Sequence, residues 1–409
     1  MIAPPSKASA NGRYAQITGW GMSVPEKVLT NADLARVVDT TDEWIVSRTG
    51  IKERHVVAGE RESTATLAIR AAREALLVAQ VLPSQIDLVI VATATPEYAF
   101  PSTASLVQDA LGASAAGAFD LSAGCSGFIY ALSMAASAVR SGSADHVLVV
   151  GAETLSRITD WTDRNTCVLF GDGAGAVVVS HCTERCGVLA TELGSDGSGG
   201  ELLIVPSGGS HRPACHESVS DGSHFIKMNG REVFRFATTV MPRATEAVAR
   251  KAGWKAEELD IIIPHQANVR IIESAAKRLS VPVDKFFVNL DRYGNTSAAS
   301  IPIALTEAIR AGRVKPGDRM VMVGFGAGLT WAAAALEWGV PIPTRPLPWW
   351  RRVFSPVLWF FAGLRSASIR TERHIYNQIM GPVGKDDWRG HLRKNTDAVR
   401  QRVRAWFKR

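Results

Sequence analysis

Residues 118–128 read AFDLSAGCSGF and place Cys125 between two glycines at the end of an apolar run. The long apolar pattern that follows predicts a helix buried on nearly every side. Cys125 is therefore expected at a strand-to-helix turn, where unpaired N–H groups and the helix dipole favour a thiolate. Gly124 and Gly127 are expected to leave room for a substrate beside the sulfur. The alternative is a buried structural cysteine, since free cysteine is among the most buried residue types.

The composition is that of an ordinary globular protein. The chain has 409 residues, of which 46% are hydrophobic and 21% charged, enough for a large core divided into two halves. Five cysteines are few and odd in number, which argues against a disulfide scaffold and favours a reducing, cytoplasmic location. We see no signal-peptide core at the N-terminus and no apolar run of the ~18–20 residues that a transmembrane helix needs.

The net charge of +7 is distributed unevenly along the chain. Residues 341–409 hold 15 Lys and Arg against 4 Asp and Glu, which leaves 31 basic and 35 acidic residues in the remainder. The body is thus mildly acidic and the tail strongly basic. This asymmetry predicts that the tail meets something anionic.

Apolar runs and amphipathic patterns alternate along the body. A helix is expected to open with Asn31 as its N-cap, and Ser63–Val78 has the apolar face of an amphipathic helix. Ile86–Ala92 is a continuous apolar run, typical of a strand covered on both faces. Glycine-rich turns followed by apolar strands recur near residues 171–180 and 324–338, which indicates an α/β fold with a duplicated layout.

The pattern suggests a division of the chain into four parts. They are a loosely packed or disordered N-terminus (1–13), a half carrying the cysteine (14–182), a second half (183–339) and a basic, Trp-rich extension (340–409).

Three polar residues stand at the ends of apolar elements: Cys125, His265 and Asn295. A cysteine nucleophile needs a partner, usually a histidine, and His265 directly follows an Ile-Ile-Ile-Pro run. Asn295 lies between a glycine and small hydroxyl residues at the start of a helix. Considered alone, each residue has a structural explanation as good as the functional one. His265 can be a hydrogen-bonded core histidine, and Asn295 can be a turn or N-cap residue.

Eight motifs in a fixed order carry a resemblance to a known family. They are TDEWI (41–45), RTGI (48–51), AFPS (99–102), AGCSG (123–127), FGDGAGA (170–176), HQAN (265–268), YGNTSA (293–298) and GFGAG (324–328). Over residues 14–338 the chain resembles β-ketoacyl-acyl-carrier-protein synthase III, the initiating condensing enzyme of the thiolase superfamily. Plain thiolases pair the nucleophile with a histidine and a second cysteine, and elongating synthases use two histidines. Asn295 in the third place favours the initiating type.

The resemblance implies a thiolase-like, five-layered α-β-α-β-α duplicated fold of the α/β class and an acyltransferase that uses no cofactor and no metal. Cys125 takes an acyl group, expected to be acetyl, from acyl-CoA, and the thioester condenses with malonyl-acyl-carrier-protein in fatty-acid biosynthesis. Backbone N–H groups of Cys125 and Gly326 would hold the tetrahedral oxyanion. Donors from His265 and Asn295 would stabilise the enolate that decarboxylation creates.

The resemblance also carries over binding residues. Those for CoA are Thr40, Trp44, Arg48 and Arg164. Those for the acyl-carrier protein are Arg235, Arg270 and Lys277. Phe100 matches a residue that crosses a homodimer interface to limit the partner's acyl pocket. Without the resemblance, Trp44 is equally a core residue, and Arg270 and Lys277 are a solvated helix face.

Two other functions stay open at this stage. One is a synthase III homologue of secondary metabolism that condenses a longer or branched acyl chain, and the other is a non-catalytic partner that binds acyl chains. A zinc site is a third idea, but the spacing of its candidate ligands is poor for structural zinc, so ordinary loop residues are expected. The candidates are His181, Cys182, Cys186, His211, Cys215 and His216.

The tail lies outside the family pattern. Residues 341–348 are rich in proline and predict a linker, and residues 349–365 place Trp and Arg around a short apolar run. This composition suits contact with a membrane surface, with a helix packed on the body or on a partner subunit as an equal alternative. Residues 395–409 form a candidate basic amphipathic helix. Nucleic-acid binding is not expected, because no recognised module accompanies the charge.

Overall fold

The computed structural model describes residues 12–340, 359 and 363–372. These residues belong to two units, of which the first contains all described residues up to 340. In the second unit, residues 363–372 are helical. The predictions for residues 1–11, 341–358 and 373–409 lie outside the described residues. Within the described part, none of the helices is both long and apolar enough to cross a membrane.

The first sheet has five strands, all from the N-terminal part of the body. β4 lies parallel to both of its neighbours, β5 and β6, whereas β7 runs antiparallel to β6 and β1. In spatial order the strands are β1 (Tyr14–Ser23), β7 (Asp172–Cys182), β6 (His146–Thr154), β4 (Leu88–Ala92) and β5 (Gly117–Leu121).

The second sheet repeats this order with four strands. They are β8 (Gly187–Ser195), β13 (Thr330–Glu337), β12 (Arg319–Gly326) and β11 (Ile261–Pro264). As in the first sheet, the first two pairings in this order, β8–β13 and β13–β12, are antiparallel, and the β12–β11 pairing is parallel. An isolated parallel bridge between Ile262 and Phe286 stands in the place that β5 takes in the first sheet. The fold is therefore duplicated, while the domain bounds at 182 and 339 stay a prediction.

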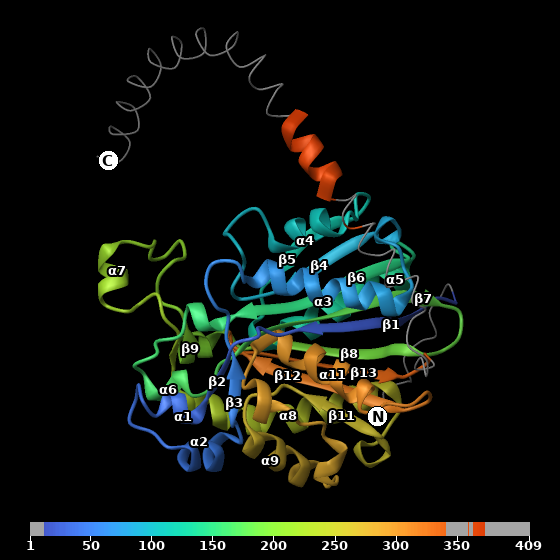
Figure 1. Cartoon of the computed structure of the whole chain (residues 1–409). Coiled ribbons are helices and arrows are strands. Elements are labelled where there is room, and N and C mark those ends of the chain that lie inside the picture. Colours follow the sequence, from blue (N-terminus) through green and yellow to red (C-terminus); the bar gives the residue numbers. More distant parts are fainter. Residues whose placement is uncertain (1–11, 341–358, 360–362, 373–409) are drawn as a thin grey trace, which may run out of the picture. The chain divides into compact units, whose positions relative to one another are not determined.

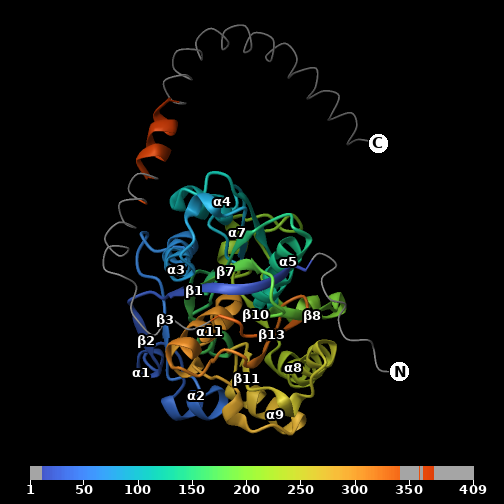
Figure 2. The ribbon, with the colours of Figure 1, turned by 90° about the vertical axis from the view of Figure 1, so that its right-hand side faces the viewer.

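Helices form three layers around and between the sheets (Figure 1). One apolar cluster joins an outer helix pair to the first sheet, a second joins the inner pair to both sheets, and a third joins another outer pair to the second sheet. The pairs are α3 (Thr64–Ala79) with α4 (Thr103–Leu111), α5 (Gly127–Ser141) with α11 (Ser300–Arg310), and α8 (Gly230–Ala252) with α9 (Val269–Leu279). Figure 2 shows α3 and α5 on opposite sides of β1 and β7. The layering is α-β-α-β-α, which confirms the expected fold class.

Shorter elements complete the body. The helices are α1 (Asn31–Leu34), α2 (Asp42–Thr49), α6 (Arg164–Cys167), α7 (His216–Ser220) and α10 (Leu290–Tyr293), and the strands are β2 (Val28–Thr30), β3 (Glu53–His55), β9 (Leu203–Ile204) and β10 (Lys227–Met228). Single 3-10 turns cover Pro83–Gln85, Gly124–Ser126, Leu155–Arg157, Gly197–Leu202, Ala256–Glu258, Val283–Lys285 and Ser297–Ala299.

The predicted N-cap at Asn31 is wrong by one residue. Thr30 caps α1, and its side chain and that of Asp33 satisfy each other's backbone N–H groups in a capping box. Asn31 is buried instead, and its amide donates to Asp42 and to the carbonyl of Ile51. Both residue types suit a cap, so only the inward contacts of Asn31 decide between them.

Candidate active site

Cys125 lies in the 3-10 turn between β5 and α5, the strand-to-helix turn that was expected. Only 8% of the residue is exposed. Burial raises the pKa of its thiol to about 12, the side chain of Ser297 lowers it, and the charge of Glu153 raises it further. The prediction of a resting thiolate is therefore wrong: desolvation outweighs the helix N-terminus, and the sulfur is a thiol at neutral pH.

The glycines around Cys125 allow neighbouring parts of the chain to pack closely. A Cβ on Gly124, which has φ +53°, would lie 2.9 Å from the backbone nitrogen of Ala327. A Cβ on Gly127 would lie 3.2 Å from the Cβ of Ala92. Gly124 nevertheless lines the larger cavity beside the sulfur, as expected, whereas Gly127 lines neither cavity at Cys125, so the expected role is corrected for Gly127 alone.

His265 follows β11 and is almost fully buried. Its backbone N–H donates to the carbonyl of Val323 at 2.8 Å, and its ring meets Phe325 edge-on at a centroid distance of 5.3 Å. Burial lowers the pKa of His265 to about 3, so the imidazole is neutral at physiological pH. Its Nδ1 has no hydrogen-bond partner among the described residues.

Asn295 is held by backbone contacts on both sides of its amide. Its own N–H donates to the carbonyl of Leu169 at 2.8 Å, and its Oδ1 accepts the backbone N–H of Ser297 at 2.9 Å. Because the oxygen is occupied in this way, the orientation of the amide is set and its nitrogen remains as a donor. Ser297 adopts φ +48°, which turns the chain sharply before α11.

Two cavities meet at the cysteine. The smaller, about 90 Å³, is lined by Cys125, His265 and Asn295 together with Phe325 and Gly326, so the structure brings the three predicted residues together. The larger, about 180 Å³, has a mainly apolar wall that no sequence motif indicated. Its lining includes Ala94, Leu155, Ile158, Phe170, Leu203 and Ile226.

A wide basic cleft leads into the smaller cavity. It contains Trp44, Arg48 and Arg164, and the two guanidinium groups lie 4.6 and 4.9 Å from the centre of the Trp44 ring. The cleft and the cavity share the wall residues Leu169, Met228, Gly230, Phe234 and Asn268. The two spaces are therefore adjacent, with the thiol at the inner end and the cations at the outer end.

The structure does not place every predicted CoA residue in this cleft. Thr40 is absent from the described lining, and its hydroxyl is buried without a hydrogen-bond partner there. Lys227, Arg231 and Arg270 also line the cleft. Lys227 and Arg231 were missed because the short stretch that contains them, residues 227–231, carries none of the recognised motifs.

The other predicted contact residues lie further out. Arg235 is exposed and pairs with Glu232, while Arg270 lies over the Phe234 ring at 5.5 Å. Lys277 is exposed on the last turn of α9. Phe100 is 87% exposed and lines neither of the two cavities at Cys125.

The metal candidates do not assemble. The sulfurs of Cys182 and Cys186 lie 3.3 Å apart, but Cys215 is exposed on α7's N-terminal side. Across residues 12–340, 359 and 363–372, no three His, Cys, Asp or Glu side chains form a group that could hold a metal ion.

Comparison with known proteins gives consistent matches. Residues 119–197 match the family model described as 3-oxoacyl-[acyl-carrier-protein] synthase III, and residues 249–338 match the model of its C-terminal part. The β-ketoacyl-[acyl-carrier-protein] synthase III of Symbiobacterium thermophilum is 56% identical over 327 residues, 80% of this chain and 99% of that protein.

Matches to solved structures are consistent with these sequence matches. The 3-oxoacyl-[acyl-carrier-protein] synthase III of Aquifex aeolicus VF5 is 51% identical with a TM-score of 0.73, covering 79% of this chain and 99% of that one. The priming β-ketosynthase of the R1128 polyketide pathway is 37% identical with a TM-score of 0.74, covering 84% of this chain and 99% of that one.

Proposed function

The chain belongs to the 3-oxoacyl-[acyl-carrier-protein] synthase III family, a family of condensing acyltransferases that initiate fatty-acid synthesis, and we propose that Cys125, His265 and Asn295 carry out its chemistry. One observation carries this proposal. The three side chains line a single small cavity that adjoins a cleft rich in arginine. A thiol nucleophile and two neutral donors at the end of a cationic cleft suit transfer from an anionic thioester.

In the first step the Cys125 sulfur attacks the thioester carbonyl of acyl-CoA. The C–S bond to Cys125 forms, the bond to the CoA sulfur breaks, and CoA leaves. The attack creates a tetrahedral oxyanion, which backbone N–H groups of Cys125 and Gly326 stabilise. The close approach of the Gly326 segment to Cys125 supports this pairing of donors.

In the second step malonyl-acyl-carrier-protein loses carbon dioxide, and the electron pair of the broken C–C bond becomes an enolate. His265 and Asn295 donate hydrogen bonds to the enolate oxygen, and the enolate carbon attacks the Cys125 thioester. The new C–C bond forms, the C–S bond to Cys125 breaks, and the cysteine leaves as a thiolate that takes up a proton from water. No base is required, because decarboxylation supplies the electron pair. A neutral His265, held so by burial, suits this role, and the Oδ1 contact of Asn295 leaves its nitrogen to donate.

The basic cleft takes the CoA moiety in this proposal. Trp44 offers an aromatic face, and Arg48 and Arg164 offer forked donors for phosphate and base. Thr40 belongs to the proposal by resemblance alone. Arg235, Arg270 and Lys277 would meet the acidic carrier protein, with Arg270 at the cleft and the other two on the exposed helix surface beside it.

The proposed acyl donor is acetyl-CoA, and the proposed assembly is a homodimer. An apolar cavity of about 180 Å³ exceeds the needs of an acetyl group, since a 150 Å³ cavity holds benzene. In a homodimer, the exposed Phe100 of one protomer would narrow the cavity of its partner. A longer or branched acyl donor is the second candidate, and the cavity volume favours it if the chain works without that partner contact.

The proposed setting is the cytoplasm, with peripheral contact between the basic extension and a membrane surface. The charge surplus of residues 341–409 supports this contact, although most of these residues lie outside the described part. Unchanged liposome binding after removal of residues 341–409 would overturn the membrane proposal.

Intact mass after incubation with acyl-CoAs from acetyl to long-chain tests the main proposal. An acetyl adduct mapped to Cys125, absent in Cys125→Ala, is expected. Adducts with longer chains alone would select the second candidate. Condensation by Cys125→Ala at the wild-type rate would overturn the mechanism.

A further inference from the structure

A buried carboxyl group, that of Glu153, is separated from the Cys125 thiol by the side chain of Ser297 alone. Glu153, at the end of β6, is fully buried and accepts hydrogen bonds on both oxygens. The donors are the hydroxyls of Thr93, Thr95 and Ser297 and the backbone N–H groups of Ala94 and Thr95, at 2.6 to 3.2 Å. A side chain surrounded by donors in this way is built to be an acceptor.

Ser297 connects this carboxyl group to the cysteine. Its hydroxyl donates to Oε1 of Glu153 at 2.9 Å, and the same side chain acts on the sulfur of Cys125, whose pKa it lowers. Cys125 and Ser297 line the apolar cavity together with Ala94, whose N–H also donates to Glu153. A continuous chain of groups therefore runs from thiol to hydroxyl to carboxylate, away from bulk solvent.

The thiol must lose its proton when it attacks a thioester. Burial holds the pKa of Cys125 high and that of His265 low, so His265 is a poor proton acceptor in the resting site. Burial also raises the pKa of Glu153, which makes its carboxylate a stronger base than an exposed one. The groups that face Glu153 are Cys125, Ser297, Ala298 and the Thr93–Thr95 segment.

We propose that Glu153, acting through the hydroxyl of Ser297, receives the Cys125 proton during acylation. The proton of the thiol passes to the Ser297 oxygen while the proton of that hydroxyl passes to Oε1 of Glu153. The sulfur forms its bond to the acyl carbon, and the bond to the CoA sulfur breaks. The proton on Glu153 then returns to the Ser297 oxygen while that hydroxyl gives its own proton to the departing CoA thiolate. Ser297 is a catalytic residue in this scheme and Glu153 is a positioning residue that stores the proton. The inference rests on the proposed role of Cys125.

The pH dependence of Cys125 alkylation by iodoacetamide separates this scheme from a structural role. If Glu153 is the acceptor, the pair has two states with the same number of protons. In one, Cys125 is a thiol and Glu153 a carboxylate; in the other, Cys125 is a thiolate and Glu153 a carboxylic acid. Their ratio does not change with pH, so the wild-type alkylation rate should be flat between about pH 6 and 9. Without the acceptor, the rate should rise about tenfold per pH unit toward the thiol pKa.

Two variants break the chain of groups at different points. Ser297→Ala keeps the backbone N–H that orients Asn295, and Glu153→Gln keeps the size of the side chain. In each variant the alkylation rate should rise with pH, without the flat region expected for the wild type. Acylation should be about 100-fold slower at neutral pH. Decarboxylation of malonyl-acyl-carrier-protein, which needs no thiol proton, should keep its rate in Ser297→Ala. If Glu153→Gln does not fold, Ser297→Ala alone decides.

The matched control is Asp172→Asn. Asp172 is equally buried and accepts from Ser156 and from the backbone of Val57, but the structure gives it no contact with the thiol. This variant should keep the flat pH profile even if its stability falls. A flat profile and unchanged acylation in Ser297→Ala would overturn the relay. Failure of the wild-type protein to acylate at Cys125 would instead overturn the proposed function.

Discussion

Gly326 lies directly against Cys125, so that a Cβ on the glycine would come within 2.5 Å of the cysteine nitrogen and 3.1 Å of its Cβ. Gly326 ends β12 in the second sheet, whereas Cys125 follows β5 in the first. The position of the Cys125 thiol is thus set by a contact between the end of β12 and the turn after β5, at a point where no side chain fits.

Gly326→Ala should destabilise the protein by about 1–3 kcal/mol and slow acylation of Cys125, because the added methyl group must displace the turn that carries the thiol. Denaturant unfolding and mass-detected acylation measure the two effects. Gly197→Ala is the control, since a Cβ there meets nothing within 4 Å. Equal stability and acylation in both variants would contradict the contact.

His265 should make stability fall in acid. Its folded pKa of about 3 lies below the ordinary 6.5, so the unfolded state binds the extra proton. The contribution is complete above about pH 6.5 and is lost as pH falls toward 3, about 2 kcal/mol by pH 5.

Urea unfolding at about pH 7.5 and 5 checks this, with His265→Asn expected to show the smaller loss. The exposed His211, replaced in the same way, serves as control. The prediction fails if His265→Asn and the wild-type protein lose the same free energy of unfolding.

Arg164→Ala should raise KM for acyl-CoA about tenfold, the equivalent of about 1.4 kcal/mol, with little change in kcat. The guanidinium contacts the Trp44 ring in the cleft and does not line the cavity of the three proposed catalytic residues.

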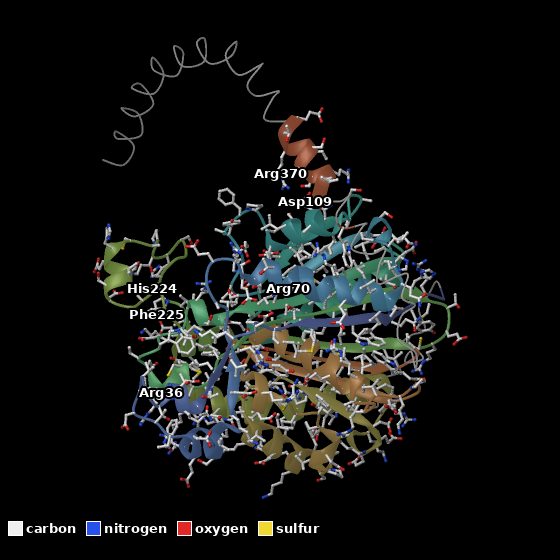
Figure 3. All side chains as sticks on the ribbon, in the orientation of Figure 1. Arg36, Arg70, Asp109, His224, Phe225 and Arg370 are labelled. Atoms are coloured by element: carbon white, nitrogen blue, oxygen red, sulfur yellow. The ribbon has the colours of Figure 1, made fainter. Side chains whose placement is uncertain are left out.

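Steady-state kinetics at two salt concentrations measure the change, which should shrink at high salt. Arg36→Ala is the control, because Arg36 pairs with Asp33 and does not line the cleft. The side chain of Arg36 is labelled in Figure 3. A fall in kcat alone would argue against a binding role for Arg164.

Phe100→Ala should leave the free energy of unfolding nearly unchanged, because 87% of the side chain is already exposed, and should broaden acyl-chain acceptance. Mass spectrometry with the acyl-CoA panel measures the range of adducts. Tyr98→Ala, at a neighbouring position with 58% exposure, should keep the wild-type range. The same range in all three proteins would remove Phe100 from the proposed acyl pocket.

Local signals in the sequence located most of the elements that carry the site. The helix expected over Ser63–Val78 is α3 (Thr64–Ala79), which the side chain of Ser63 caps, and the run Ile86–Ala92 contains β4 (Leu88–Ala92). Capping and apolar periodicity are properties of adjacent residues, so they can be read without knowledge of the fold. The N-cap at Asn31 failed because two capping residues adjoin there and a distant contact selects one of them.

The sequence by itself determined the family, the α/β class, the duplicated layout and the three residues that meet at the cavity. Only the tertiary structure decided that burial favours the neutral thiol of Cys125, that Gly124 packs against the backbone of Ala327, and that Glu153 accepts a hydrogen bond from Ser297. The reason is physical: desolvation, close approach and buried hydrogen bonds depend on segments that are distant in sequence and adjacent in space.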